Sequence, residues 1–220
     1  MIEQIEIRNL LPCVFAGMED TDRIRSSQIW EEPSFVFHRG CRLCVHAESG
    51  NGKSSLLHFI YGSRKDYKGS ILFDGTDISA LSIAQWCEVR TKGIALLPQD
   101  MALFPELTVG QNIDLKNNMT HHKSNEQIKN LLARLGIDDK HDVAAGKLSI
   151  GQMQRVALVR AVCQPFDFIF LDEPVSHLDA RNNKIVADII TEEANNQGAG
   201  IISTSVGNHL MLDNAKFVLL

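Results

Sequence analysis

Short apolar runs alternate along the chain with segments in which apolar residues recur at helical spacing. Strand-like runs occupy 2–14, with a break at Pro12, and 34–37, 42–45, 70–73, 93–97, 168–171, 201–202 and 217–220. The run 168–171 is apolar at every position, which is typical of a strand buried on both faces of a parallel sheet. Asp74-Gly75 is a tight-turn signal directly after the run 70–73.

Helical spacing is clearest between residues 125 and 135. Four apolar residues there fall at i, i+3, i+4 and i+7: Ile128, Leu131, Leu132 and Leu135. Ser124 or Asn125 can cap the start of this helix, and Gly136 ends it. Further helices are predicted at 56–61, 151–163 and 181–195. The polar segment 19–27 is predicted to be a loop.

Strands that alternate with helices predict an α/β fold with a largely parallel central sheet covered by helices. A mostly helical segment, from 98 to 165, separates two sheet-forming parts. The sequence has no internal repeat and no linker long enough to divide it, and 220 residues suit one domain. We therefore expect a single domain over 1–220, with a core made of 1–97 and 166–220 and a helical subdomain at 98–165.

The composition argues against two classes of protein. The formal net charge is −5, whereas non-specific binding of nucleic acid needs a basic face, so we expect no nucleic-acid partner. No run of about eighteen apolar residues occurs, and Glu3, Glu6 and Arg8 lie where a signal peptide would be apolar. We expect a cytoplasmic protein without direct membrane insertion, so any membrane role requires a separate subunit.

Cys41 and Cys44 have C-x-x-C spacing, which is compatible with a zinc or redox site. The second half of a zinc site is missing from the sequence, and residues three apart in a strand point to opposite faces. We expect the pair to be buried thiols in a reducing compartment.

The segment Ala47–Ser55 has the features of a phosphate-binding loop. It follows a predicted strand and opens a helix, which is the context that such a loop requires. Gly50 and Gly52 allow backbone N–H groups to turn inward, Lys53 supplies charge for the β- and γ-phosphates, and the Ser54 hydroxyl can ligate Mg²⁺. The other predicted nucleotide-binding residues of the loop are Glu48, Ser49, Asn51 and Ser55.

One position of this loop departs from the usual pattern, because Ala47 stands where the first glycine is expected. A left-handed backbone at Ala47 would cost on the order of 1 kcal/mol.

A second acidic site follows the buried run 168–171. Asp172 would lie at the carboxyl end of a parallel strand, where ligands of such sheets bind, and can hold Mg²⁺ through its water shell. Glu173, one residue on, can act as general base toward an attacking water. Solvated acids at a strand end are common, but together with the phosphate loop the pair predicts nucleotide hydrolysis.

The run Leu148-Ser149-Ile150-Gly151-Gln152 resembles the Leu-Ser-Gly-Gly-Gln signature of ABC ATPases. Its Gln152 stands twenty residues before Asp172, as in that family, and Gln99 matches the glutamine of the family's Gln loop. Ser176-His177-Leu178-Asp179 matches the loop after the catalytic glutamate. The resemblance extends from about 34 to 206, with a weaker likeness to the small ATPases of lipoprotein-releasing and macrolide-export systems.

This resemblance implies a P-loop NTPase fold with an N-terminal antiparallel β portion and a helical subdomain. It implies a homodimer in which ATP lies between Lys53 of one chain and Ser149, Gly151 and Gln152 of the other. Gln99 would join Ser54 and Asp172 as a Mg²⁺ ligand and would act with Lys53 and Glu173 in hydrolysis. The partner would be an integral membrane permease, which places the chain at the inner face of the cell membrane.

Other positions leave alternatives open. Ser205 stands where the family usually has a histidine that orients the water, so hydrolysis is expected to be slower, and His209 either substitutes or packs on the surface. Phe15 and Trp30 are candidates for stacking on adenine, or else belong to the core. The segment 101–109 either accepts a permease helix or fills the helical subdomain. The alternative function is a nucleotide-dependent switch without transport, bound to a membrane or envelope complex.

Overall fold

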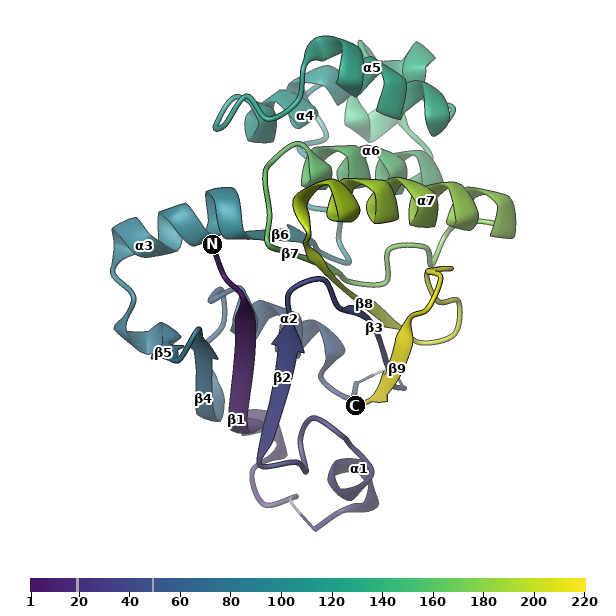
Figure 1. Ribbon diagram of the computed structural model, residues 1–220. Coiled ribbons are helices and arrows are strands. Elements are labelled where there is room, and N and C mark those ends of the chain that lie inside the picture. Colours follow the sequence, from purple (N-terminus) through teal and green to yellow (C-terminus); the bar gives the residue numbers. More distant parts are fainter. Residues whose placement is uncertain (19, 49) are drawn as a thin grey trace.

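Five parallel strands form the central sheet, in the order β6-β7-β8-β3-β9 (Figure 1). The computed structural model describes residues 1–18, 20–48 and 50–220. The strands of this sheet are β3 (Arg42–His46), β6 (Ile94–Leu97), β7 (Phe168–Leu171), β8 (Gly200–Ser205) and β9 (Lys216–Leu219). Alternate residues of β7 pack into two different apolar clusters, so both faces of the sheet are buried. The predicted α/β fold with a largely parallel sheet is confirmed.

An antiparallel sheet, in the order β2-β1-β4-β5, carries the N-terminal residues. Its strands are β1 (Gln4–Pro12), β2 (Ser34–His38), β4 (Tyr67–Phe73) and β5 (Thr76–Asp77). The tight turn predicted at Asp74-Gly75 joins β4 to β5, and both residues have positive φ, as that turn requires. The antiparallel β portion implied by the family resemblance is therefore present.

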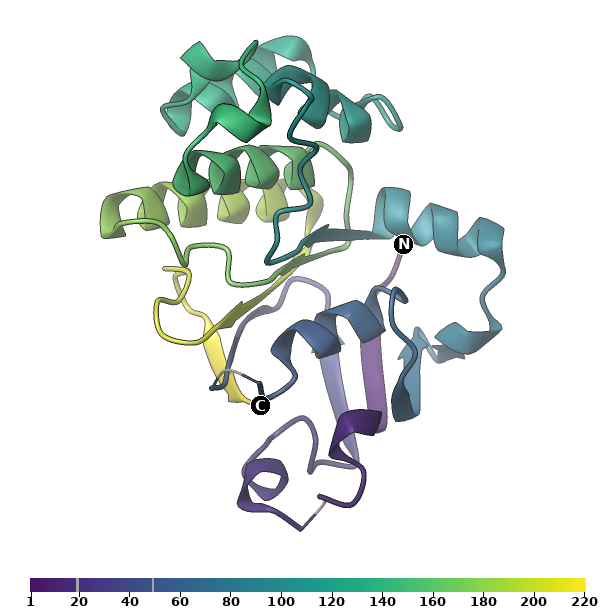
Figure 2. The same ribbon diagram turned by 180° about the vertical axis from the view of Figure 1, so that it is seen from behind.

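Helix α2 (Lys53–Ile60) lies between the two sheets, as Figure 2 shows from behind. Four of its apolar residues are buried in one cluster with side chains of both sheets: Leu56, Leu57, Phe59 and Ile60. Burial of such side chains stabilises the fold by about 1.5–3 kcal/mol each. The first turn of α2 is thereby fixed against the carboxyl end of β3.

The starts of α3 (Ile83–Glu88), α4 (Val109–Asn117), α5 (Asn125–Arg134) and α6 (Ile150–Val162) share one capping pattern. In each, a serine or threonine hydroxyl accepts the N–H of a glutamine three residues on, and the glutamine side chain accepts the N–H of the cap. The pairs are Ser82 with Gln85, Thr108 with Gln111, Ser124 with Gln127, and Ser149 with Gln152.

Helices α4, α5 and α6 gather above the parallel sheet in Figure 1, next to α7 (Ala180–Gln197). Two ion pairs join α7 to the segment 123–134: Lys123 with Glu193 and Arg134 with Glu192, each with an N–O distance of 2.6 Å. The first pair is buried and the second is largely exposed.

Several predicted boundaries were wrong. The helix expected at 56–61 begins at Lys53, the one expected at 151 begins at Ile150, and α7 extends to 180–197. The segment 19–27, predicted to be a loop, contains a short helix α1 (Asp22–Arg25) that buries Ile24. Helices α3 and α4 were not predicted; α3 buries no residue fully, and α4 buries Asn112 and Asn117 as well as apolar groups, so neither shows clear helical periodicity.

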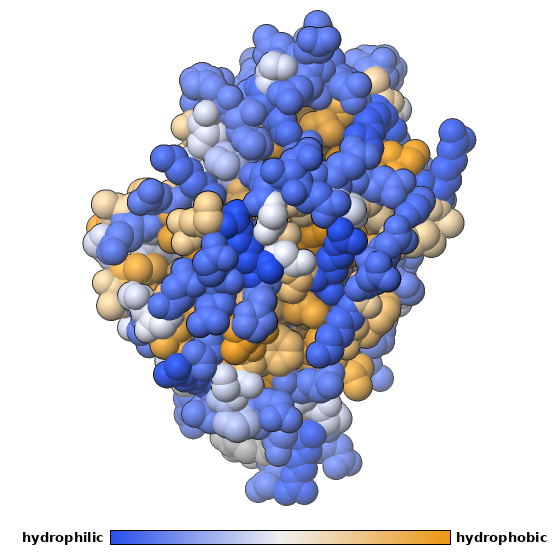
Figure 3. All heavy atoms as spheres, viewed as in Figure 1, coloured by the Kyte–Doolittle hydropathy of each residue, from blue (hydrophilic) through white to orange (hydrophobic). Residues whose placement is uncertain are grey.

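Short 3₁₀ segments complete the connections: Cys13–Phe15 (η1), Ile78–Ala80 (η2), Asp138–Lys140 (η4) and Ala145–Lys147 (η5), with a π-helical turn at Val89–Gly93 (η3). Strand β9 forms one edge of the parallel sheet, and its Phe217 and Leu219 are about half exposed. Figure 3 shows apolar surface among polar side chains on the face of the molecule seen in Figure 1. Among the described residues, none of the helices combines the length and the apolar character needed to span a bilayer.

Candidate nucleotide-binding site

The phosphate-binding loop connects the carboxyl end of β3 to the start of α2. Gly50 and Gly52 have φ of +85° and +92°, a left-handed backbone that glycine adopts without strain. Ala47 is not among the described residues with positive φ, so the predicted cost of an alanine at this place does not arise. Ser49, also predicted to bind the nucleotide, lies outside the described residues.

Lys53, Ser54 and Ser55 form the first turn of α2, with Gly52 as its N-cap. Their N–H groups belong to a helix N-terminus, which favours a bound anion.

The ammonium group of Lys53 is held inside the phosphate-binding loop. Its Nζ donates to the carbonyl oxygens of Ala47 and Glu48 at 2.9 and 3.0 Å, which uses two of the three donors of an ammonium group. Burial lowers the pKa of Lys53 below its usual value, while the charges of Glu173 and Asp172 oppose that shift. The ammonium group is therefore held by the loop, and it lies near enough to Asp172 and Glu173 for their charges to favour its protonated form.

Two aromatic side chains pack against the phosphate-binding loop. The indole Nε1 of Trp30 donates to the carbonyl oxygen of Asn51 at 3.2 Å, and a Cβ at Gly52 would lie 3.3 Å from the Trp30 ring and 3.4 Å from that of Phe15. Both rings are buried, with exposed fractions of 5% for Trp30 and 3% for Phe15. Both rings belong to a core cluster, and Phe15 also lines a cavity at the phosphate loop.

The carboxylate of Asp172 is buried at the end of β7. Its Oδ1 accepts a hydrogen bond from the Thr204 hydroxyl at 2.6 Å, and its Oδ2 has no hydrogen-bond partner among the described residues. The same Thr204 oxygen accepts the N–H of Glu173 at 3.1 Å. Thr204, on the neighbouring strand β8, therefore fixes both acids, and sequence reasoning missed it.

Glu173 has φ of +49°, an uncommon conformation for a residue other than glycine. It lies directly before Pro174, a position that normally favours extended backbone. Strain of this kind costs on the order of 1–3 kcal/mol and collects at functional sites.

Two adjoining cavities bring the predicted residues together. One of about 210 Å³ is lined by loop residues 50 and 52–55, by Val14 and Phe15, and by Gln99 and Glu173. The other, of about 470 Å³, is lined by Ser54, His58, Gln99 and Asp172 among others. Ser54 and Gln99 border both cavities, so the phosphate loop, the glutamine and the acids share one site.

The donors in this site suit Mg²⁺. A buried carboxylate oxygen without a partner, on Asp172, is costly unless a cation or water balances it. The Ser54 hydroxyl and the Gln99 amide border the same cavity, and hard oxygen ligands of this kind are those that Mg²⁺ prefers.

The signature run begins α6 and presents an exposed helix start. Ser149 caps the helix, its hydroxyl accepting the N–H of Gln152 at 3.3 Å, and both Ser149 and Ile150 are exposed. None of these residues lines either cavity at the phosphate loop. Within one chain, the described part of the structure therefore keeps the two predicted half-sites apart.

One residue links α6 to the general-base candidate. The buried side chain of Gln154 donates to the carbonyl oxygen of Glu173 at 3.0 Å and accepts the N–H of His177 at 3.3 Å. Gly151 lies so close to this loop that a Cβ there would be 3.3 Å from the His177 carbonyl oxygen. The loop 173–177 is thus held by the helix that carries the signature.

A comparison with known families decides what these motifs mean together. The family described as ABC transporter matches residues 30–176, about two thirds of the chain, and includes the loop, the signature and both acids. The chain belongs to the ABC transporter family.

Relatives in this family carry transport names. The chain is 31% identical over 175 residues to the lipoprotein-releasing system ATP-binding protein LolD of Buchnera aphidicola, covering 78% of this chain and 76% of the relative. It is 28% identical to the ABC transporter ATP-binding protein YtrE of Bacillus subtilis, covering 87% and 84%. The resemblance to lipoprotein-releasing ATPases inferred from the sequence is confirmed.

Solved structures agree in fold. A dimeric ATP-binding cassette in a post-hydrolysis state, bound to ADP and Pi, superposes with a TM-score of 0.71 at 19% identity, over 93% of this chain and 88% of that one. A putative ABC transporter ATP-binding protein from Pyrococcus furiosus gives 0.70 at 23% identity, over 98% and 97%. As a member of the ABC transporter family, the chain is an ATP-binding subunit that hydrolyses ATP, and the transport assignment outweighs the switch.

The ABC transporter family usually has a histidine where this chain has Ser205. Ser205 is buried at the end of β8, with its Oγ 3.6 Å from the sulfur of Cys44 and 3.5 Å from Nδ1 of His46. The ring of His209 packs edge-on against Phe217, with ring centroids 5.2 Å apart.

Cys44 is buried as expected, whereas Cys41 is only partly buried, and burial raises the pKa of Cys41 to about 11.

The segment 101–109 was predicted either to accept a permease helix or to fill the helical subdomain, and its residues differ in this respect. Phe104 is 53% exposed, while Leu103 packs against the core cluster of the helices. Met101 and Ala102 have φ of +61° and +46°, and their carbonyl oxygens each accept a hydrogen bond from Arg160 at 2.7 Å. The loop is therefore held in a strained shape by α6, with one aromatic side chain facing solvent.

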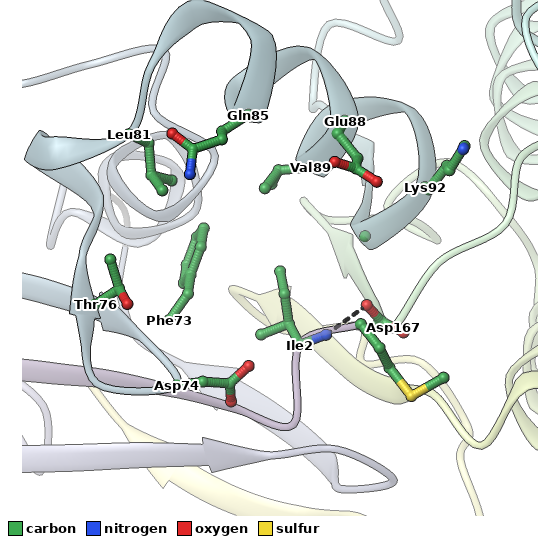
Figure 4. Close-up of a pocket in the computed structure, with 12 residues that line it drawn as sticks. Ile2, Phe73, Asp74, Thr76, Leu81, Gln85, Glu88, Val89, Lys92 and Asp167 are labelled. Atoms are coloured by element: carbon green, nitrogen blue, oxygen red, sulfur yellow. Dashed lines mark hydrogen bonds between the residues drawn. The ribbon is translucent and has the colours of Figure 1, made fainter.

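A separate cavity of about 530 Å³ lies between the antiparallel sheet and α3 (Figure 4). Two of its acids bind main-chain groups near the start of the chain: Asp167 accepts the N–H of Ile2 at 2.7 Å, and Asp74 accepts the N–H groups of Glu3 and Gln4. The Asp167 bond ties the residue before β1 to the start of β7, and the Asp74 bonds tie the start of β1 to the turn after β4, so these two acids have a structural role.

Proposed function

We propose that two copies of this chain close around two ATP molecules and drive an integral membrane permease. Each triphosphate would lie between the phosphate loop of one copy and Ser149, Gly151 and Gln152 of the other. The observation that carries this proposal is the exposed, capped start of α6, a kind of helix end that favours anions and that meets no phosphate site within the described residues of its own chain. Two-fold symmetry would then give two equal sites.

In each site the loop would bind the phosphates. The N–H groups of 48–55 and the ammonium of Lys53 would hold the β- and γ-phosphates. Ser54, Gln99 and Asp172 would hold Mg²⁺, which when bound neutralises charge on the phosphates.

Glu173 would take a proton from the attacking water, since this residue borders the loop cavity together with Gln99. Thr204 and Gln154 hold its backbone in place, so the base is positioned before substrate binds. The departure of the γ-phosphate would remove the contacts that join the two copies, and the dimer would open.

The permease would dock beside the loop after Gln99, where Phe104 is exposed. This contact would place the chain at the inner face of the cell membrane without inserting it into the bilayer. Changes at Gln99 would reach the permease through the segment 101–105, which Arg160 ties to α6. The transported molecule would be selected by the permease.

Mg²⁺-dependent phosphate release by the purified chain tests this function. Lys53→Ala should weaken ATP binding by about 10- to 100-fold, because it removes a charged hydrogen-bond donor. Glu173→Gln should keep ATP binding and lose about 10²- to 10⁴-fold in turnover, the usual contribution of a general base.

Exposed residues on α5 provide matched controls, Lys129→Ala and Glu126→Gln, which make the same chemical changes away from the site. Both controls should behave as the parent chain. Full turnover in Lys53→Ala, or equal losses in the controls, would contradict the assigned roles.

A further inference from the structure

The cavity between the antiparallel sheet and α3 lies apart from the nucleotide site (Figure 4). It shares no lining residue with either cavity at the phosphate loop. Its volume of about 530 Å³ falls in the range of sites that bind small molecules, about 300–1,000 Å³. The start of the chain, the turn after β4 and helix α3 each supply part of its lining. A ligand here would therefore occupy a site of its own.

The walls of this cavity are largely apolar. Ile2 and Phe73 are buried in the core cluster that α2 shares with both sheets. Leu81, before α3, and Val89, at its end, pack against the same cluster. Figure 4 shows these four side chains around the cavity. The apolar part of a ligand would leave water on contact with them, and each CH₂ group so buried strengthens binding by about fourfold.

Two carboxylates of the lining have no cationic partner among the described residues. The Glu88 side chain makes no hydrogen bond or ion pair there, and the Asp74 carboxylate accepts only main-chain N–H groups. In contrast, Oδ1 of Asp167 lies 3.4 Å from Nη2 of Arg39. Low-dielectric walls strengthen the attraction of an unneutralised charge for its counter-ion. The free acids therefore favour a ligand with a cationic group.

Lys92 also lines the cavity and would favour an acidic ligand instead. The lining contains three acidic side chains and this one basic side chain, so negative charge prevails. Figure 4 shows the Glu88 carboxylate extending from α3 toward the cavity, whereas the Lys92 ammonium points away from the other labelled side chains. Both observations favour a cationic ligand over an acidic one.

We propose that this cavity binds a small amine with an apolar body. The body would lie against Phe73, Leu81 and Val89, and the ammonium group would face Glu88 and Asp74. A hydrogen bond between charged groups strengthens binding by about 10- to 100-fold. The inference concerns a site separate from the proposed nucleotide-binding function and does not depend on it.

NMR titration of the ¹⁵N-labelled chain with a matched set of probes tests the inference. The compounds 4-phenylbutylamine, 4-phenylbutanol and 4-phenylbutyrate have the same apolar body and differ in the charge of the head group. The amine should shift backbone signals of residues 81–93 and bind at least about tenfold more tightly than the alcohol, with the acid weakest. Equal dissociation constants, tightest binding of the acid, shifts confined to other residues, or no saturable amine binding at about 10 mM would each overturn the inference.

Glu88→Gln removes the charge and keeps the shape of the side chain, which is exposed and makes no contact needed for folding. It should bring the amine to within about threefold of the alcohol and leave the alcohol unchanged. Glu126→Gln, the same change on an exposed position of α5, should alter neither constant. Leu81→Ala should weaken all three probes by a similar factor, because it shortens the apolar wall.

These variants separate recognition of the amine from simple uptake by an apolar cavity. A Glu88→Gln chain that keeps the full preference for the amine would show that Glu88 does not select the ligand, and would overturn the inference. So would probe affinities that are unchanged in Leu81→Ala, since the apolar body would then bind elsewhere. An unchanged NMR spectrum away from residues 81–93 shows that each variant is folded.

Discussion

Thr204→Val removes one hydroxyl that joins both acids of the site. In the native chain this hydroxyl donates to Asp172 Oδ1 at 2.6 Å and accepts the N–H of Glu173 at 3.1 Å, and Thr204 is 1% exposed. Valine has nearly the same shape, so the change leaves no cavity. It removes a hydrogen bond to a charged group, about 1.5–3 kcal/mol, and leaves the partly buried N–H of Glu173 without this partner, about 1–3 kcal/mol.

We therefore expect Thr204→Val to lower the free energy of unfolding by about 3–5 kcal/mol. Thr204→Ser keeps the hydroxyl and should lose only about 1 kcal/mol, the cost of one buried methyl group. Urea unfolding without nucleotide, followed by circular dichroism, measures both variants.

The Mg²⁺ dependence of ATP hydrolysis gives a second test of the role of the Thr204 hydroxyl. Because the freed carboxylate of Asp172 can rotate, Thr204→Val should also need more Mg²⁺ for half-maximal ATP hydrolysis. Equal stability and equal Mg²⁺ dependence in the valine and serine variants would refute the idea that this hydroxyl positions the acids.

Other parts of the structure give three further predictions. Gln154→Leu should lower kcat by about tenfold with little change in the KM for ATP, because it frees the loop of Glu173 without touching the phosphate loop; a change in KM alone would contradict that role. Lys123→Ala, which leaves a buried glutamate unpaired, should cost about 3–5 kcal/mol of unfolding free energy, whereas Arg134→Ala, in an exposed pair, should cost less than about 1 kcal/mol; similar losses in thermal unfolding would argue against this difference. Burial and the Lys123 charge lower the pKa of His122 below 6.5, so the unfolded chain binds a proton first as pH falls. Stability should therefore drop as pH falls below about 6.5, and His122→Gln should flatten that drop in urea titrations between pH 5 and 7.

The parts of the fold that the sequence predicted best are those in which local pattern and tertiary position agree. The run 168–171 is apolar at every position because both faces of β7 are buried, so its burial could be read directly. Ser124 was one of two residues predicted as the cap of α5, with Asn125 as the alternative, because the helix after them has a regular apolar face, and Ser124 is the cap. Helices α3 and α4 begin with the same capping pair but lack such a face, and they were missed.

The site was predictable where its residues are neighbours in sequence and not where they meet only in the fold. The phosphate loop and the acids after β7 carry their chemistry within a few residues. Thr204 reaches Asp172 only because β8 lies beside β7, and that pairing is not encoded near either residue. The burial of Trp30 beneath Gly52 depends in the same way on how the segment before β2 folds back.

The central claim is that one triphosphate is shared by two copies of the chain. Sedimentation velocity of Glu173→Gln with ATP, combined with a count of bound nucleotide, tests it most directly. We predict an ATP-dependent dimer that holds two nucleotides, and we predict that adding Ser149→Arg gives a monomer that still binds ATP, because Ser149 would act on the other copy's nucleotide. A chain that stays monomeric at saturating ATP, or a Ser149→Arg chain that loses nucleotide as completely as Lys53→Ala, would contradict the shared site.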